Sequence, residues 1–239
     1  MSGKTTGFAR PIRTLALPAG GLYIAIILLG MTSEIALRGP LIAYGDAAQT
    51  AVNILANETA FRLSLLADLL MAMADVALAV LLCAMFWAIS PLLAVLATAF
   101  RLMQAATIAA NLLTQQSALL LLTGPMDPSA AAPLALHAMT QHAYGYDLGL
   151  AFFALNSALL GLLLIVGRDM PAWLGVGLIG AGAVYATGTL LRLLAPSYFA
   201  AFTPAYALPL LAETAMALWL LWRAFALKTA HHRPPLAQM

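Results

Sequence analysis

Several ionisable side chains lie inside stretches of the sequence that are otherwise apolar, where they could do chemistry within a membrane. They are Glu34, Asp68, Asp75, Arg101, Arg192 and Glu213. An ionised group at hydrocarbon depth costs several kcal/mol, so it normally faces the protein interior, pairs with a partner and serves a function. This set therefore predicts a buried polar site, for which a cation, a proton or a small polar solute is one candidate occupant.

Most of these polar groups are expected in one half of the membrane. An α-helix rises about 1.5 Å per residue, so the position of a residue in its helix gives its depth in the membrane. Each predicted helix places a polar group in the half of the membrane farther from the two terminal segments, which is the outer half if those segments are cytoplasmic. The candidate pocket residues are Glu34, Arg38, Asp68, Asn111, Gln115, Arg192 and Glu213. We expect them to line an outward-facing ligand pocket, while the catalytic residues, if the site reacts, remain unknown.

Asp75 and Arg101 are predicted to form a buried ion pair. Asp75 lies about eleven residues from the inner end of its helix and Arg101 about ten residues from the inner end of the next, and a very short turn joins the two helices. Antiparallel neighbours with so short a connection bring equal depths together. Because polar residues also hold membrane helices together, the pair has a second interpretation, in which it only determines which helices meet.

The composition assigns the chain to a class of protein. Hydrophobic residues make up 63% of the 239 residues and charged residues only 8%. Soluble domains are roughly half apolar and one-quarter charged. The chain is therefore predicted to be an integral membrane protein that resides in the lipid bilayer, and we expect no nucleic acid partner.

Six apolar stretches of about 20 residues predict six transmembrane helices. They run over residues 17–37, 61–89, 91–113, 147–166, 172–194 and 205–227. Between the first two, Asp46, Thr50, Asn53 and Asn57 recur at helical spacing. This spacing predicts a short amphipathic helix at the membrane interface, which either anchors the chain there or caps the pocket.

The predicted fold is all-α, with a six-helix transmembrane domain over residues 17–227 between an N-terminal segment, 1–16, and a C-terminal tail, 228–239. One side of this domain carries Lys4, Arg10, Arg13, Arg168, Lys228 and Arg233, whereas the other carries Arg38 and Arg62. Lysine and arginine are enriched on the cytoplasmic side of membrane proteins. Both terminal segments are therefore predicted to be cytoplasmic.

The stretch 172–194 is rich in small residues that let helices approach closely. They are Gly175, Gly177, Gly180, Ala181, Gly182, Ala183, Ala186 and Gly188. Such a helix is expected at the centre of the bundle or at a dimer contact, and the centre is favoured because Arg192 must be kept from lipid. A homodimer or a larger membrane complex is a further expectation.

Motifs that hold metals, nucleotides or catalytic nucleophiles do not occur in the sequence, which has no HExxH, GxSxG, CxxC or Walker loop. Haem between helices would need histidines inside the spans, and His137 and His142 are expected in the loop before the fourth span. A retinal Schiff base would need a lysine inside a span, but Lys4 and Lys228 lie outside the spans. The sequence therefore predicts no cofactor and no metal site.

A family resemblance rests on residues spread along the chain. They are Gly21, Leu22, Tyr23, Arg38, Pro40, Asp46, Thr50, Asn53, Ile54, Glu58, Phe61, Arg62, Asp68, Asp75, Arg101 and Asn111, followed by Pro171, Leu174, Gly175, Gly182 and Tyr185. In order and spacing, the chain resembles the bacterial membrane family called domain of unknown function 4386, over roughly residues 16–227. The resemblance implies an uncharacterised multi-helix protein of the bacterial inner membrane, and it implies no activity.

Three functions of different classes are compatible with these features. The first is a small carrier or ligand-binding protein that uses Glu34, Asp68 and Glu213 as the charged lining of its pocket. The second is an intramembrane enzyme acting on a lipid, with Asp68 or Asp147 and His142 as general acid and base. The third is an accessory or assembly subunit, in which the charge pairs only specify packing.

Overall fold

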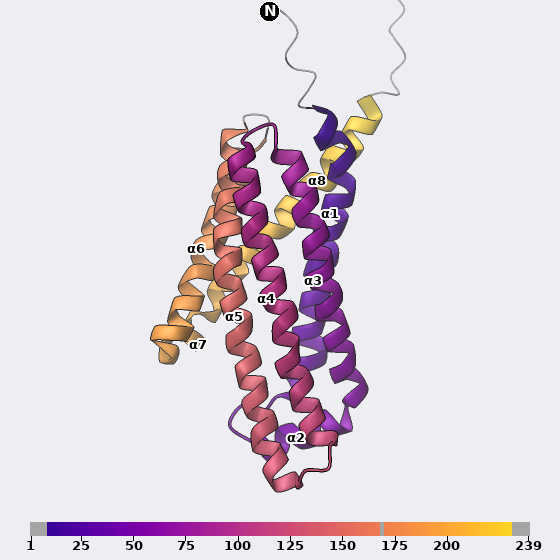
Figure 1. The fold of residues 1–239 in the computed structure, drawn as a ribbon. Coiled ribbons are helices and arrows are strands. Elements are labelled where there is room, and N and C mark those ends of the chain that lie inside the picture. Colours follow the sequence, from indigo (N-terminus) through magenta and orange to yellow (C-terminus); the bar gives the residue numbers. More distant parts are fainter. Residues whose placement is uncertain (1–8, 168–169, 231–239) are drawn as a thin grey trace, which may run out of the picture.

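The computed structural model describes residues 9–167 and 170–230, and in these ranges the chain forms helices and no strand (Figure 1). The main helices are α1 (Ala9–Met31), α2 (Ala47–Ala56), α3 (Glu58–Phe86), α4 (Pro91–Thr123), α5 (Pro128–Val166), α6 (Ala172–Leu194) and α8 (Ala207–Ala230). Short elements complete them: η1 (Thr32–Arg38) and η2 (Gly39–Leu41) after α1, and η3 (Pro196–Tyr198), α7 (Phe199–Phe202) and η4 (Thr203–Tyr206) before α8.

Six helical segments of the described chain are long and apolar enough to cross a membrane. This confirms the predicted all-α class and the predicted number of spans. The short helix predicted between the first two spans is also present, as α2. The protein is therefore a multipass membrane protein built as a helical bundle.

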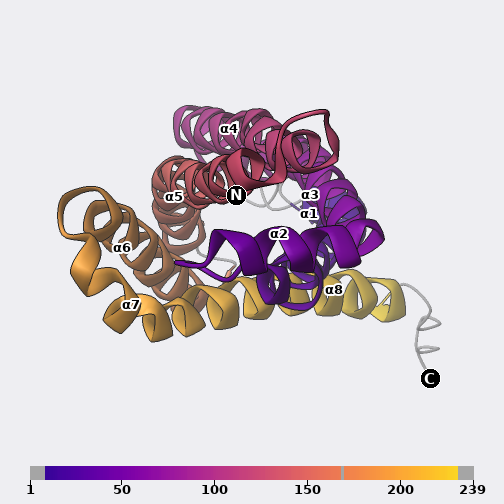
Figure 2. The same cartoon turned by 90° about the horizontal axis from the view of Figure 1, so that it is seen from below.

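The described ends of the chain lie at the same end of the bundle, where α1 begins and α8 ends (Figure 1). We call this the terminal end, and the opposite end, where α2 lies across the bundle, the α2 end (Figure 2). Lys4, Arg168 and Arg233, on which part of the predicted orientation rests, lie outside the described residues. The orientation of the bundle in the membrane therefore stays a prediction.

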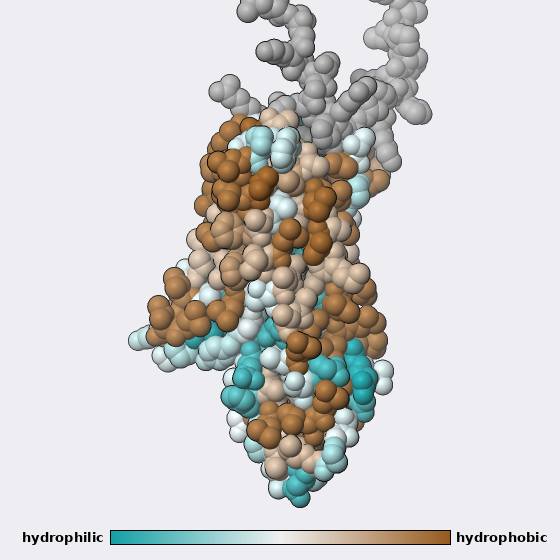
Figure 3. Space-filling view, in the orientation of Figure 1, coloured by the Kyte–Doolittle hydropathy of each residue, from teal (hydrophilic) through white to brown (hydrophobic). Residues whose placement is uncertain are grey.

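Helices α4 and α5 extend well past the thickness of a membrane at the α2 end. Their 33 and 39 residues correspond to about 50 and 58 Å at 1.5 Å per residue, against about 30 Å of hydrocarbon. α6, with 23 residues, spans about 35 Å and ends far short of them. Hydrophilic side chains gather toward the α2 end, below a largely hydrophobic band (Figure 3).

The prediction of a loop before the fourth span was wrong, because the helix of that span, α5, begins at Pro128 and not near Asp147. Hydropathy detects the part of a helix that crosses lipid, whereas the helix itself begins where its first N–H groups find acceptors. Asp127 is the N-cap, and its Oδ1 accepts the Ser129 N–H at 2.8 Å. The Ser129 hydroxyl also donates to Oδ1, at 2.5 Å, and the hydrogen bonds from this hydroxyl and from the N–H lower the pKa of Asp127. Similarly, α1 begins at Ala9 rather than at residue 17.

Helix α2 closes the α2 end of the bundle. Asp46 caps it by accepting the Gln49 N–H at 2.8 Å, as an aspartate at an N-cap commonly does. Its buried Ile54 packs with Phe61 of α3, Leu119 of α4 and Met139 of α5. α2 therefore joins three long helices where they project beyond the membrane.

Two apolar clusters lie at different heights along the long helices. The cluster nearer the terminal end includes Tyr23, Leu78, Phe86, Leu163 and Leu220, and the other is the cluster around α2. The buried polar residues of α3, α4 and α5 fall between them in sequence. They are Ser64, Asp68, Asp75, Arg101, Gln104, Asn111, Gln115, His142, Asp147, Asn156 and Ser157. The bundle therefore holds a polar layer between two apolar ones.

Helix α6 packs closely against α5 through glycines. A Cβ on Gly175 would lie 2.5 Å from the carbonyl oxygen of Gly161, and one on Gly182 would lie 2.6 Å from that of Ala154. The predicted central position was nevertheless wrong, because α6 lies at the edge of the bundle (Figure 2). Its charged Arg192 is kept from lipid by neighbours near the end of the helix, so a central position is not required.

Replacing Gly175 with alanine is expected to destabilise the α5–α6 contact by about 1–3 kcal/mol, because backbone must move to admit the new methyl group. Gly177→Ala is the matched control on the same helix, since its Cβ would meet only the Ala212 Cβ at 3.5 Å. Thermal unfolding of the purified variants in detergent measures the difference. Equal melting temperatures for the two variants would contradict this packing.

Candidate functional site

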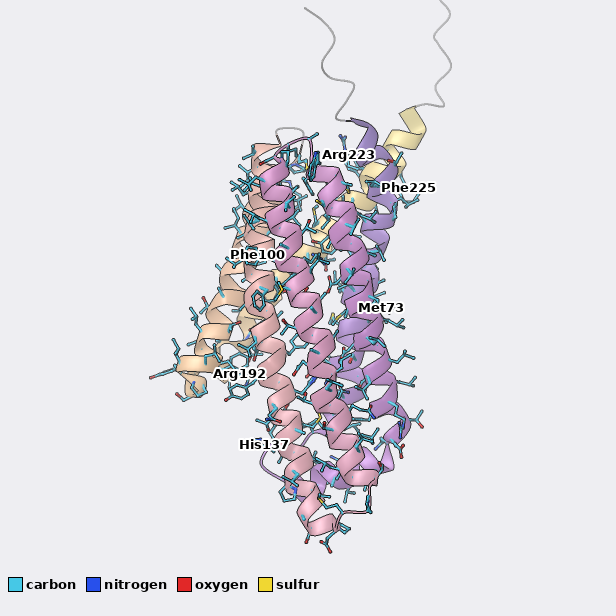
Figure 4. The ribbon with its side chains drawn as sticks, viewed as in Figure 1. Met73, Phe100, His137, Arg192, Arg223 and Phe225 are labelled. Atoms are coloured by element: carbon cyan, nitrogen blue, oxygen red, sulfur yellow. The ribbon has the colours of Figure 1, made fainter. Side chains whose placement is uncertain are left out.

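A cavity of about 360 Å³ lies where η1, α3, α5 and α6 meet, on the side of the bundle toward the α2 end. Charged and polar side chains in its lining are Glu34, Arg38, Asp68, His142, Asp147, Arg192 and Thr203. Aromatic rings in its lining are Tyr44, Tyr146, Tyr185, Phe199 and Tyr206. We call this space the main cavity, and Arg192, labelled in Figure 4, marks its border on α6.

Arg38 organises one wall of the main cavity. Its side chain is buried, and its Nη1 donates to the Asp68 carboxylate, to Gln115 Oε1 at 3.0 Å and to Ser33 Oγ at 3.3 Å. Its Nε donates to Glu34 Oε2 at 3.1 Å. One guanidinium therefore connects η1 with α3 and α4, and its charge is matched by two carboxylates.

The π-helical turn η1 presents Arg38 to these partners. In a π-helix each N–H bonds five residues back, as the Gly39 N–H does to the carbonyl of Glu34. π-turns of this kind occur frequently at functional sites. Gln115 accepts a hydrogen bond from Arg38 through its Oε1. Its own orientation is fixed because its Nε2 donates to Ser64 Oγ at 2.7 Å.

A second ion pair forms the opposite wall. Arg192 Nε of α6 lies 2.5 Å from Asp147 Oδ2 of α5, and the Arg192 guanidinium stacks over the Phe199 ring at 3.6 Å from the centroid. Thr189 Oγ1 donates to the backbone carbonyl of Asp147 at 2.8 Å. The end of α6 is therefore fixed to α5 by a charge pair, an aromatic stack and a hydrogen bond.

His142 brings an unpaired polar atom to the main cavity. The residue is only 4% exposed, and Asn111 Nδ2 donates to its backbone carbonyl at 2.7 Å while lying 3.3 Å from its Nδ1. Among the described residues, its Nε2 has no hydrogen-bond partner. The hydroxyl of Tyr206 is likewise unpaired in the described chain. Buried polar groups are rarely left unpaired because the cost is about 1–3 kcal/mol each, so such atoms mark a place for a ligand or water.

Glu213 lies in a neighbouring cavity of about 180 Å³, which we call the deep cavity. Its Oε1 accepts the Tyr185 hydroxyl at 2.6 Å. Asp75 and Gln104 line the same space. Gly30, Tyr146, Leu150, Tyr185 and Tyr206 line both cavities, which therefore adjoin.

The predicted pocket residues are thus distributed over several places. Glu34, Arg38, Asp68 and Arg192 line the main cavity. Asn111 and Gln115 do not line the main cavity but hydrogen-bond residues that do, Asn111 to His142 and Gln115 to Arg38. Glu213 lies in the deep cavity, and its partner is Tyr185 and not one of the arginines.

Asp75 of α3 and Arg101 of α4 form an ion pair, as the antiparallel register of the two helices predicts. Arg101 Nη2 lies 2.5 Å from Asp75 Oδ1, and both side chains are almost fully buried. The guanidinium also lies 5.0 Å and 5.1 Å from the ring centroids of Tyr23 and Phe153. The pair therefore links α3 and α4 with α1 and α5.

Sequence reasoning missed the contribution of α5 to the main cavity. Six residues of α5 line the main cavity and recur at helical spacing. They are Met139, His142, Ala143, Tyr146, Asp147 and Leu150. This period indicates one face of a helix and was visible in the sequence. The prediction of a loop up to His142 hides this period, because it divides the lining residues between a loop and a helix.

The predicted position of the two histidines in a loop, on which the expected absence of haem depends, was wrong. Both His137 and His142 lie in α5. In the described ranges, no group of three or more histidine, cysteine, aspartate or glutamate side chains is arranged to hold a metal ion.

Comparison with models of known protein families gives a match. A family model described as "Domain of unknown function (DUF4386)" matches residues 18–224. The comparisons with curated proteins and with solved structures found no match.

A double-mutant cycle on Asp75→Asn and Arg101→Gln is expected to show strong coupling. Each single change leaves a buried charge without its partner, which costs about 3–5 kcal/mol, and the double variant should lose much less than the sum. Chemical unfolding of the purified protein in detergent measures these differences.

The control cycle uses Glu58 and Arg62 of α3, whose paired side chains are 40% and 55% exposed. Exposed pairs contribute about 0–1 kcal/mol. Additive losses at Asp75 and Arg101, as at the control pair, would show that the buried pair contributes no interaction energy.

Proposed function

The chain belongs to the DUF4386 family, whose description assigns no activity, and from this premise we propose that the protein is a ligand-binding membrane protein whose main cavity receives a small polar molecule. The observation that carries the proposal is a cavity of about 360 Å³ between two walls of paired charges, with His142, whose buried Nε2 is unpaired among the described residues, in its lining. A carrier function would use the same site.

The size of the main cavity favours binding over a purely structural role. A passive scaffold needs charges packed against one another without free space, whereas the space here is about 360 Å³. Small-molecule sites typically measure about 300–1,000 Å³ and combine apolar walls with a few placed polar groups. The accessory-subunit reading is therefore less well supported than binding.

The hydrogen bonds also favour binding over catalysis. As general acid and base, His142 and Asp68 or Asp147 would each need a side chain free to exchange a proton with the substrate. Instead, Asp68 is bound by Arg38 and Asp147 by Arg192, and the His142 side chain contacts Asn111 and Thr114. These arginines stabilise the carboxylates as charged groups, which suits recognition of a polar ligand.

The proposal includes a location and an orientation. We place the protein in the bacterial inner membrane, with both termini in the cytoplasm and the main cavity facing outward. Support comes from the excess of basic residues in the terminal segments and in the 167–171 connection, compared with the α2 end. Association into a homodimer or a larger membrane complex stays a prediction.

Filling the main cavity is expected to abolish binding while the fold survives. Ala143 lines the cavity, so Ala143→Phe should remove the thermal stabilisation given by any active member of a panel of amino acids, choline and glycerol 3-phosphate. Leu148→Phe on the same helix is the control, because Leu148 is 44% exposed and lies outside the lining. Melting temperatures in detergent report binding by mass action. If stabilisation is equal in the two variants, or no compound stabilises the protein, the proposal fails.

The orientation predicts which cysteines react from outside the cell. In a Cys83→Ser background, Met126→Cys in the α4–α5 connection should react with a membrane-impermeant maleimide in intact spheroplasts. Trp87→Cys in the α3–α4 connection should react only after the membrane is opened. Both native side chains are exposed, at 42% and 52%. The reverse labelling pattern would show that the main cavity faces the cytoplasm.

A further inference from the structure

We propose that the deep cavity is a subsite for an organic ammonium group, with Glu213 as its counter-charge and Gln104 as a second acceptor. This inference rests on the proposed ligand-binding function and names the chemical class of part of the ligand. Three features support it: the charge of Glu213, the unpaired hydrogen-bond acceptor of Gln104 and the aromatic side chains that line the cavity.

Glu213 differs from the other buried acids in having no cationic partner. Asp68, Asp75 and Asp147 each pair with an arginine. In the part of the chain that the structure describes, no basic nitrogen lies within 4 Å of the Glu213 carboxylate, although the residue is only 8% exposed. A buried carboxylate without a cationic partner either takes up a proton or stays ionised at a high cost, and a bound cation stabilises the ionised form.

Gln104 lines the same space and carries a buried unpaired acceptor next to it. The residue is 95% buried, since its exposed fraction is 5%, and its Nε2 donates to Asp75 Oδ2 at 3.4 Å. Its Oε1 has no hydrogen-bond partner among the described residues. An ammonium group carries three donors and no acceptor, so it complements a cavity that offers a carboxylate and a free amide oxygen.

Aromatic rings form much of the remaining wall. Tyr146, Phe153, Tyr185 and Tyr206 line the deep cavity. The ring centroids of Phe153 and Tyr185 lie 5.3 Å apart, and those of Tyr185 and Tyr206 lie 5.9 Å apart. Aromatic faces attract cations and are the usual walls of sites for ammonium groups.

The same features disfavour a metal ion as the occupant. Calcium takes six to eight oxygen ligands, and the described residues contain no group of three potential acidic, histidine or cysteine ligands. The volume of about 180 Å³ also far exceeds the roughly 10–15 Å³ that holds one water. The space suits an ammonium group with carbon attached to it.

The tilt of α8 gives the deep cavity its position. α8 runs diagonally, beside α1 near the terminal end and toward α6 at its start (Figures 1 and 2). The cavity is lined by Met31 of α1 and Leu210 of α8, which are 40% and 38% exposed and so mark its rim. A free amine that enters through the main cavity and the headgroup of an aminophospholipid that enters between α1 and α8 would present the same ammonium group.

The test uses n-butylammonium chloride with the full-length protein in detergent. It should raise the melting temperature, whereas its neutral isostere 1-butanol, sodium butanoate and equimolar sodium chloride should not.

Glu213→Gln keeps the shape of the side chain and an acceptor for Tyr185, and should bind butylammonium at least tenfold more weakly. Leu210→Phe, which fills the cavity from its rim, gives a second route to the same loss. Leu218→Phe on α8 is the control, because Leu218 is 55% exposed and outside the lining.

Nanodiscs of phosphatidylethanolamine and of phosphatidylglycerol separate the two sources. Stabilisation by phosphatidylethanolamine that is lost in Glu213→Gln identifies the headgroup, and stabilisation by butylammonium alone identifies a free amine. Equal stabilisation by 1-butanol or sodium chloride, or an unchanged response in both Glu213→Gln and Leu210→Phe, overturns the inference. Such a failure leaves the main cavity untouched, because that site is tested separately by Ala143→Phe.

Discussion

The structure depends on the rule that a charge inside a membrane must be neutralised by the protein, because hydrocarbon offers no solvation. Arg101 follows this rule as the largest fully buried side chain of the described residues. It is 1% exposed, and it bonds Asp75 of α3 while lying over the rings of Tyr23 on α1 and Phe153 on α5. Since four helices contribute to one guanidinium environment, the neutralisation of this charge determines which helices are neighbours.

The same rule explains why packing and recognition use the same residues near the α2 end. Arg38 and Arg192 hold η1 to α3 and α6 to α5, yet both also line the main cavity. Both guanidiniums are neutralised by carboxylates, and Arg38 is buried among its partners whereas the Arg192 side chain stays 23% exposed. Glu213 departs from this arrangement because its protein partner is a neutral hydroxyl. The two cavities therefore differ in character, one with paired charges and one with a single uncompensated acid among the described residues.

Much of the architecture was predictable because lipid imposes strong local constraints on sequence. An apolar run long enough to cross the hydrocarbon predicts a helix, and equal depths along a short hairpin predicted that Asp75 would meet Arg101. The periodic polar residues before Asn57 predicted α2. These features follow from short stretches of sequence.

The remaining features depend on contacts between distant segments. α5 continues into polar sequence, where hydropathy fails although helix formation does not. The pairing of Asp147 with Arg192 needs the end of α6 beside α5, and the separation of Glu213 from the arginines follows from the tilt of α8. Neither relation is encoded in local spacing. The candidate residues could therefore be identified singly, whereas their division between two cavities could not.

The π-helical turn η1 gives the wall around Arg38 a tolerance to a change in chain length. A π-turn holds one residue more than an α-helix would use. Losing one residue between Glu34 and Arg38 would leave the Gly39 N–H on the Glu34 carbonyl, now as an ordinary α-helical bond four residues back. The side chains that follow would keep close to their present direction, whereas one residue lost from a regular α-helix rotates everything after it by about 100°. A one-residue deletion inside η1 would thus leave Arg38 facing Asp68, and the same deletion one turn earlier would not.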